Sequence, residues 1–268
     1  MDTVTTLALT LVAASLAAFS LSSSWIKRAR SQSRVTLTVL MYHKISDTKY
    51  DELTLRQSDF AAQLRWLAEN GYVTISFTEL VQHHARRANL PQKPIIISFD
   101  DSYHNNFVFA YPLLKQFGFK ATIFVPVAYV GKTNVWDNGT EPLMSYDTMR
   151  QMTDVVEFGV HSHAHKDYRL LTAEEIATDI ACAHATVIES GFPYSPVFAY
   201  PYGGLPKNPA LRQHVKTLLR QHGFLCAARI KGTANRLPLS DMYEICRIGI
   251  SGYDTLTTFI SKVKNGKA

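Results

Sequence analysis

Apolar stretches typical of strands alternate with amphipathic stretches typical of helices over residues 36–250. Runs of mostly apolar residues predict strands at 36–42, 72–75, 94–99, 121–125, 156–160, 196–200, 224–229 and 243–250. Apolar residues at helical spacing predict helices at 58–70, 77–88, 111–117, from 172 onward and at 211–222. Strand and helix alternate about seven times, which predicts a parallel α/β sheet with its motifs at strand ends.

Local signals mark where some of these helices begin. Ser58 precedes the first helical pattern as a candidate N-cap. Thr172 and Glu175 form a capping box before a later helix. Residues 131–144 predict an irregular loop, and this loop carries Trp136.

The N-terminal segment has no charge between residues 3 and 26 and is mostly apolar from 7 to 21. Its length suits a helix that spans a bilayer, and the basic residues after Trp25 suit an interface anchor. A cleaved signal peptide lacks its basic n-region here, and a buried soluble helix would not end in an abrupt basic stop. We expect a membrane anchor or signal-like segment at 1–30, a linker at 31–35 and one domain at 36–268.

Composition and net charge limit the classes of partner that the protein can bind. The chain of 268 residues is 46% hydrophobic and carries a net charge of +6. Four of the positive charges and one negative charge belong to the N-terminal segment and linker, which leaves 24 basic minus 21 acidic residues, or +3, for the rest. This scattered charge argues against nucleic acid as a partner. The three cysteines lack CxxC spacing and do not imply a disulfide framework.

Two carboxylates follow the most apolar strand. Asp100 and Asp101 come directly after the strand at 94–99, where they would lie at the mouth of the sheet. A turn or helix cap is the ordinary alternative for such a pair. About sixty residues later, His161, His163 and His165 alternate along the chain. A carboxylate with paired imidazoles is a ligand set that zinc prefers, and the second aspartate remains for proton transfer, so the set predicts a metal-assisted hydrolase.

The geometry of the histidine segment decides which rings can meet. In an extended stretch all three rings share one face, whereas in a turn only His161 and His165 do. If the segment is a turn, His163 is a surface residue or supports the metal-binding residues without binding the metal itself.

Three segments together resemble the polysaccharide deacetylases, the NodB-homology group or carbohydrate esterase family four. These segments are SFDDS at 98–102, HSHAH at 161–165 and AYPYGG at 199–204, in the order of the family's motifs. The resemblance covers roughly residues 36–250. The opening VLMYH at 39–43 also resembles the subgroup that deacetylates poly-N-acetylglucosamine of biofilms.

The resemblance implies a fold, a metal and two roles. The fold is a distorted (β/α)7 barrel. The metal ligands are Asp101, His161 and His165, which hold a divalent metal, zinc or alternatively cobalt or nickel. Asp100 is the general base that takes a proton from water. The family pattern leaves His163 at a free position.

The third motif adds an oxyanion donor and shows a departure from the family. The resemblance implies that the backbone N–H of Tyr202 binds the oxyanion, although a simple structural turn also fits this sequence. Many family members carry an arginine, which orients the catalytic aspartate, where this chain has Ala199. Arg247 on the last predicted strand is the candidate replacement, with a residue at the rim of the site as the alternative.

The family's late motifs, one with a Trp that walls the pocket and one with a histidine acid, have no convincing match. His43 is the candidate for the missing acid, with a structural histidine as the alternative.

These observations predict a membrane-tethered, metal-dependent hydrolase that removes N-acetyl groups from N-acetylglucosamine-type sugars of a glycan. A deacetylase of a lipid-linked sugar intermediate and a catalytically silent carbohydrate-binding domain are the alternatives. The expected location is an inner or plasma membrane, with a single pass. The basic flank after the apolar segment favours a cytoplasmic domain. Family enzymes that modify exported polysaccharide work outside that membrane, so the side stays open.

Overall fold

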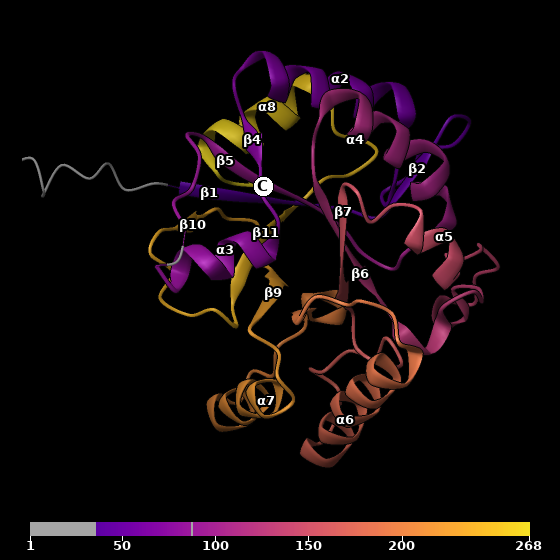
Figure 1. Cartoon of the computed structure of the whole chain (residues 1–268), viewed down its shortest axis with the longest axis vertical. Coiled ribbons are helices and arrows are strands. Elements are labelled where there is room, and N and C mark those ends of the chain that lie inside the picture. The colour runs from indigo at the N-terminus through magenta and orange to yellow at the C-terminus, as the bar shows by residue number, and fades with distance from the viewer. Residues whose placement is uncertain (1–35, 87) are drawn as a thin grey trace, which may run out of the picture. The chain divides into compact units, whose positions relative to one another are not determined.

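A closed ring of seven parallel strands forms the centre of the part of the chain that the structure describes, residues 36–268 apart from residue 87 (Figure 1). The structure is a computed structural model. The strands of the ring are β1 (Thr36–Tyr42), β5 (Pro94–Phe99), β6 (Ala121–Val125), β7 (Val156–Val160), β8 (Val197–Ala199), β9 (Cys226–Ile230) and β11 (Ile245–Gly249). β1 pairs with both β5 and β11, which closes the ring. The predicted α/β fold, a distorted (β/α)7 barrel, is confirmed.

The barrel is distorted because its strands pair unevenly. β6 and β7 pair along their whole length, whereas β7 meets β8 at one residue pair, Val160 with Phe198. Short strands lie outside the ring: β2 (Lys44–Ser46), β3 (Thr54–Arg56), β4 (Val73–Thr74) and β10 (Asn235–Arg236). β4 pairs with the beginning of β5, and β6 pairs with its end.

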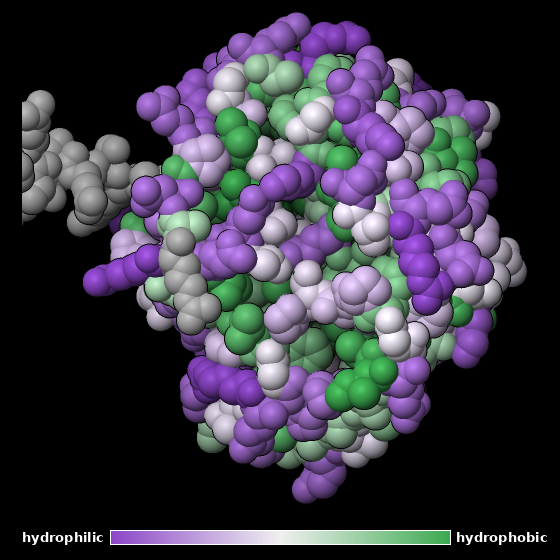
Figure 2. Space-filling view, in the orientation of Figure 1, coloured by the Kyte–Doolittle hydropathy of each residue, from purple (hydrophilic) through white to green (hydrophobic). Residues whose placement is uncertain are grey.

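Helices surround the strands in Figure 1, with α2, α4 and α8 along one edge and α6 and α7 along the opposite edge. The α-helices are α2 (Gln57–Glu69), α3 (Phe77–His84), α4 (Tyr111–Phe117), α5 (Tyr146–Arg150), α6 (Ala173–Ser190), α7 (Pro209–Gln221) and α8 (Leu256–Asn265). Shorter helical turns are η1 (Asn106–Ala110), η2 (Val127–Tyr129), η3 (Val135–Asp137) and η4 (Pro201–Gly203). Polar and charged residues cover most of the face shown in Figure 2, with hydrophobic residues in patches between them.

The side chains of each strand alternate between the barrel interior and the surrounding helices, as the period of two requires. Val39, Ile96 and Phe124 belong to the cluster inside the barrel. Their neighbours Leu40 and Ile97 belong to the larger cluster that the strands share with the helices. Because both faces are buried, most residues of the barrel strands are apolar.

One end of the barrel is covered by α3. Phe77 and Leu80 of this helix belong to the interior cluster. Glu157, near the beginning of β7, accepts hydrogen bonds from the backbone N–H groups of Phe77 and Thr78 at 3.0 and 3.1 Å. The hydroxyl of Thr122, near the beginning of β6, donates to the same carboxylate at 2.8 Å. These contacts cover the end at which the strands begin, so the opposite end is the one available for a site.

Several predicted boundaries were correct and others need correction. The strands at 36–42, 94–99, 121–125 and 156–160 and the capping box of Thr172 with Glu175 are present as predicted. Ser58 is not an N-cap, because α2 begins one residue earlier and its N-cap is Arg56, which makes no side-chain cap bond. The helix predicted at 77–88 ends at His84. The sequence pattern also missed α8, whose Phe259 and Val263 are buried.

The predicted anchor at 1–30 and linker at 31–35 lie outside the described residues. Within residues 36–268, leaving out 87, no helix combines the length and the apolar character needed to cross a bilayer.

Gly159 on β7 provides a test of how tightly the barrel interior is packed. A Cβ atom at this position would lie 2.7 Å from Cγ2 of Val197 and 2.8 Å from the ring of Phe124. We expect Gly159→Ala to lower the free energy of unfolding by about 1–3 kcal/mol, the usual range for overpacking. The control is Gly249→Ala on β11, where the nearest atom would be Cε of Met41 at 3.4 Å. Equal losses in denaturant titrations of the two variants would contradict a tightly packed interior at Gly159.

Candidate active site

A cavity of about 500 Å³ lies at the ends of the barrel strands, opposite α3. The predicted site residues that line it are His43, Asp100, Asp101, His161, His165 and Tyr202. Arg247 does not line it but contacts Asp100 from the barrel interior. His163 is half-buried and does not line the cavity, in agreement with its predicted free position.

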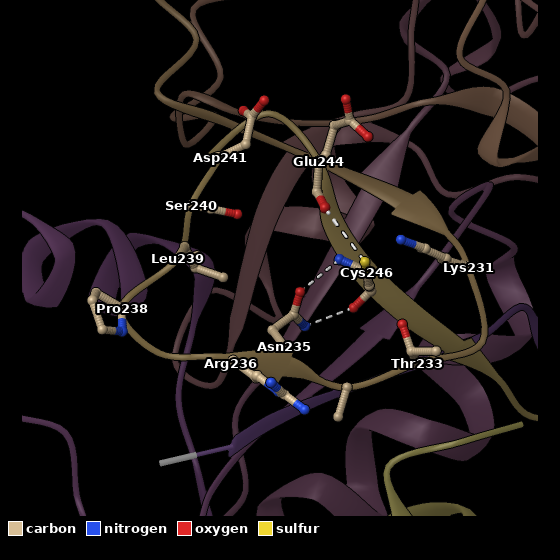
Figure 3. A pocket seen from close by; sticks show the side chains of 11 residues that line it. Lys231, Thr233, Asn235, Arg236, Pro238, Leu239, Ser240, Asp241, Glu244 and Cys246 are labelled. Carbon is tan, nitrogen blue, oxygen red and sulfur yellow. Dashed lines mark hydrogen bonds between the residues drawn. The ribbon is translucent and has the colours of Figure 1, made fainter. Parts of the chain in front are cut away.

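A somewhat larger cavity, of about 630 Å³, lies beside β10 and β11 and is lined by none of the predicted site residues (Figure 3). In its lining, the side chain of Asn235 accepts from the backbone N–H of Cys246 and donates to its C=O, both at 2.8 Å. Within the described residues, the group of side chains suited to hold a metal is elsewhere, in the 500 Å³ cavity. The volume of a cavity therefore does not by itself identify the active site.

Strand periodicity explains why distant residues meet. His43 follows β1 in phase with the interior residue Val39, and Asp100 follows β5 in phase with Ile96. The same alternation aims Arg247 of β11 inward, in phase with Ile245 of the interior cluster. Because parallel strands end at the same edge, these side chains converge on one end of the barrel.

Asp101, His161 and His165 form the group that could hold a metal ion. One ligand atom from each lies within 4.8 Å of the others. Oδ1 of Asp101 lies 3.6 Å from Nε2 of His161 and 3.0 Å from Nε2 of His165. This oxygen is buried and has no hydrogen-bond donor in suitable geometry among the described residues. A buried carboxylate oxygen without a donor, facing two imidazole nitrogens, fits a divalent metal.

The sheet orients His161 for such a role. Its Nδ1 lies 2.8 Å from the carbonyl oxygen of Ala199, to which it donates, and this leaves Nε2 facing the carboxylates. Its backbone N–H donates to the carbonyl of Val125 at 2.8 Å. The residue that replaces the family's arginine, Ala199, therefore contributes its backbone to the site.

Asp100 is held by a buried arginine. Arg247 is 0% exposed, and its Nη1 and Nη2 donate to Oδ1 and Oδ2 of Asp100 at 2.6 and 2.8 Å. The guanidinium carbon also lies 5.3 Å from the centre of the Phe124 ring. This geometry places the predicted replacement for the missing arginine directly on the predicted base.

Burial and charge act in opposite directions on the two carboxylates. Burial raises the pKa of Asp100, but the charges of Arg247 and His161 outweigh it and hold that pKa below its ordinary value. Burial likewise raises the pKa of Asp101, and the imidazoles of His165 and His161 lower it further than burial raises it. Burial lowers the pKa of His161 to about 4, against the opposing charge of Asp100. Both carboxylates are therefore ionised and His161 is neutral at neutral pH.

The three motifs share a strained backbone that the sequence patterns did not predict. Asp101, Ser102, Ser162, His165 and Tyr202 all have positive φ, between 52° and 72°. Non-glycine residues in this left-handed region cost of order 1–3 kcal/mol each and persist only where their surroundings hold them. The strain is thus concentrated where the side chains converge.

Tyr202 occupies a tight turn at the edge of the cavity. Backbone bonds from Gly203 to Tyr200 and from Gly204 to Pro201, both 2.9 Å, close this turn. Tyr202 is 48% exposed, and the centre of its ring lies 4.9 Å from that of His165. The oxyanion role of its N–H stays a prediction.

Trp136 is a cavity residue that the motif comparison did not identify. It lies in η3 of the loop 131–144, and its ring centre is 4.5 Å from that of His165 and 5.0 Å from that of Tyr129. Asn134 supports the loop by accepting from the N–H of Glu141 at 2.8 Å. A tryptophan in a long loop between two strands was the available signal, but its distance from the motifs gave no reason to place it beside His165.

Comparison with known proteins gives the site a family. The polysaccharide deacetylase family model matches residues 87–224, about half of the chain, and the chain belongs to this family.

Individual relatives agree with this family. YxkH of Bacillus subtilis is 28% identical over 186 residues, which cover 68% of this chain and 61% of that protein. The poly-beta-1,6-N-acetyl-D-glucosamine N-deacetylase of Staphylococcus aureus is 24% identical over 177 residues, which cover 62% of this chain and 60% of the relative. The chain thus spans about three fifths of the length of these relatives.

Solved structures agree on the fold. IcaB from Ammonifex degensii superposes with a TM-score of 0.72 at 23% identity, over 85% of this chain and 97% of that one.

The buried pair of Asp100 and Arg247 predicts a pH-dependent loss of stability when the arginine is removed. Arg247→Met leaves an unpaired buried carboxylate, and we expect a loss of roughly 3–5 kcal/mol in the free energy of unfolding at neutral pH. In the wild-type protein the lowered pKa of Asp100 stabilises the fold above the pKa of the unfolded chain, and this contribution is lost as pH falls. In the variant, burial unopposed by Arg247 raises that pKa, so protonation relieves the unpaired charge. The difference between the two proteins should therefore shrink on acidification.

Denaturant titrations from about pH 7 to about pH 5 measure this difference. Arg229→Met is the control, because Arg229 pairs with Glu244 away from the site and is partly exposed. A difference that stays constant or widens toward acid would contradict the pairing.

Proposed function

We propose that this protein is a metal-dependent hydrolase that removes N-acetyl groups from N-acetylglucosamine-type sugars of a glycan. The observation that carries the proposal is the convergence of Asp101, His161 and His165 beside an Asp100 that Arg247 holds ionised. The membership in the polysaccharide deacetylase family and the similarity to a Staphylococcus aureus poly-beta-1,6-N-acetyl-D-glucosamine N-deacetylase support this substrate class.

The ligand set suits zinc, with cobalt or nickel as alternatives. Oδ1 of Asp101 and Nε2 of His161 and His165 are the atoms that would hold the ion. Two imidazoles and one carboxylate are a common catalytic set for zinc. When bound, such an ion polarises a carbonyl oxygen and lowers the pKa of water.

Asp100 takes the role of general base. Its lowered pKa keeps the carboxylate ionised, and Arg247 fixes the positions of both oxygens. Each oxygen keeps a further lone pair for the proton of the attacking water. The pair with Arg247 orients the base and so limits its motion during proton transfer.

The departing amine needs a proton from another side of the cavity, and His43 is the proposed donor. His43 follows β1, lines the cavity and is half-buried. The side-chain amide of Asn106 donates to its backbone carbonyl at 3.0 Å, which fixes the strand end. A protonated imidazole can give a proton to a departing amine, as a general acid must.

The rest of the cavity suits a sugar with an acetamido group. Trp136 and Tyr202 line the cavity next to His165, with ring centres 4.5 and 4.9 Å from its own. We assign the backbone N–H of Tyr202 to the oxyanion of the tetrahedral intermediate, where one such donor is typically worth about 3–4 kcal/mol. Acetate release from N-acetylglucosamine oligomers, measured together with metal content, tests the proposed activity.

Separate roles for the two aspartates predict separate phenotypes. Asp100→Asn should keep the bound metal and lose turnover, because it removes the base and none of the ligands. Asp101→Ala and His161→Ala should lose both metal and turnover. Metal analysis and acetate release measure the two effects, and Asp147→Asn, at an aspartate whose side chain is 91% exposed, should change neither. Activity of Asp100→Asn within roughly tenfold of wild type would be less than a general base is worth and would refute its role.

The proposed acid predicts a change in the pH profile. With Asp100 as base and His43 as acid, kcat/KM should be bell-shaped in pH, and its alkaline limb should depend on the acid. We expect His43→Ala to lower kcat by about 10²–10⁴-fold and to flatten the alkaline limb without changing metal content. His214→Ala, at an exposed histidine of α7, is the matched control. An unaltered alkaline limb in His43→Ala would leave His43 with a structural role.

A further inference from the structure

A buried carboxylate on α6 accepts hydrogen bonds from the turn that carries His165. Asp179 is 7% exposed, and its Oδ1 accepts from the backbone N–H of Ala164 at 2.9 Å. Its Oδ2 accepts from the N–H of His163 at 3.1 Å and from the hydroxyl of Tyr168 at 2.8 Å. Three neutral donors thus stabilise this buried charge.

The two candidate histidine ligands are supported very differently. The sheet binds His161 through its backbone N–H and through Nδ1, both at 2.8 Å. Nδ1 of His165 is buried and has no hydrogen-bond partner among the described residues. The position of the His165 ring therefore depends on the backbone of the turn and on packing against aromatic rings.

That turn is held in an unfavourable conformation. Ser162 and His165, at its two ends, have φ of 64° and 52°. The hydroxyl of Ser162 accepts from the N–H of His165 at 2.9 Å. Asp179 binds the peptide N–H groups of the two residues between them. Its carboxylate therefore acts on the part of the turn where strain would otherwise be released.

We propose that Asp179 is a positioning residue for metal binding, which acts by fixing the turn so that His165 faces Asp101 and His161. This inference rests on the proposed function, because it assumes that these three residues hold the metal. Asp179 lies outside the ligand group and acts only through the backbone of the turn and the hydroxyl of Tyr168. Its loss should weaken metal binding more than its effect on stability explains.

The test is a zinc titration of the metal-free full chain in competition with a chromogenic chelator, with thermal unfolding measured in parallel. Asp179→Asn keeps the size of the side chain but turns an NH₂ group toward N–H or O–H donors. We expect the Kd for zinc to rise by at least about tenfold, the usual effect of losing a partner outside the ligand shell. Excess zinc should restore much of the acetate release, since the ligands themselves remain.

The matched control is Thr172→Ala, on the same helix. Thr172 caps α6 by accepting from the N–H of Glu175 at 3.2 Å, and its capping box with Glu175 lies at the start of the helix. It should lower the melting temperature and leave the Kd for zinc unchanged. If Asp179→Asn does not fold, Tyr168→Phe, which removes one of the three donors, should raise the Kd by a smaller factor.

The outcomes separate the inference from the proposed function. A wild-type protein that binds no zinc contradicts both. A wild-type protein that binds zinc, with an unchanged Kd in the folded Asp179→Asn variant or in its Tyr168→Phe substitute, overturns the positioning role alone. A rise in Kd that Thr172→Ala reproduces at equal loss of stability also overturns it.

Discussion

The ion pair between Asp100 and Arg247 is the constraint on which the rest of the site depends. Both residues are buried, and two charges in a barrel interior are tolerated only because two short hydrogen bonds join them. The pair spans β5 and β11, which both flank β1, so the closure of the barrel creates it. The same contact keeps Asp100 ionised and leaves Asp101 free to face the histidines. A charge pair that is costly for folding is thus also what separates the two adjacent carboxylates into different environments.

A second constraint is backbone strain at the three motifs. Asp101, His165 and Tyr202 adopt left-handed conformations that ordinary loops avoid, and buried polar contacts hold the segments around them. Asp179 supplies such contacts to the histidine turn, and Ser162 adds one within it. The result is a set of side chains aimed at one point by local geometry, with little freedom left to lose when a ligand binds.

Different parts of the chain form the floor and the wall of the cavity. Strand ends supply the floor, where Nε2 of His161 lies 3.7 Å from Oδ2 of Asp100, whereas the loop 131–144 supplies Trp136. Such loops vary in length without disturbing the barrel, so this is where substrate preference can change while the chemistry stays. Family membership therefore describes the floor of the site, and under the proposed function the choice of glycan would depend more on wall residues such as Trp136.

The sequence by itself placed the seven barrel strands, four of them with the observed bounds, together with the order of the motifs and the residue types of the site, because apolar periodicity and short motifs are local properties. Through a family resemblance it named Asp101, His161 and His165 as ligands, and it offered Arg247 as one candidate for the arginine that the family pattern lacks here. Only the tertiary structure decided which of these side chains touch, since barrel closure brings β5 and β11 to opposite edges of β1. It also decided the place of Trp136 and the contacts of Asp179, which join segments whose sequences carry no sign of one another. The N-cap predicted at Ser58 was wrong for a similar reason. The strand β3 ends at Arg56 and α2 begins at the next residue, so the start of the helix follows the end of the strand and not a single polar residue.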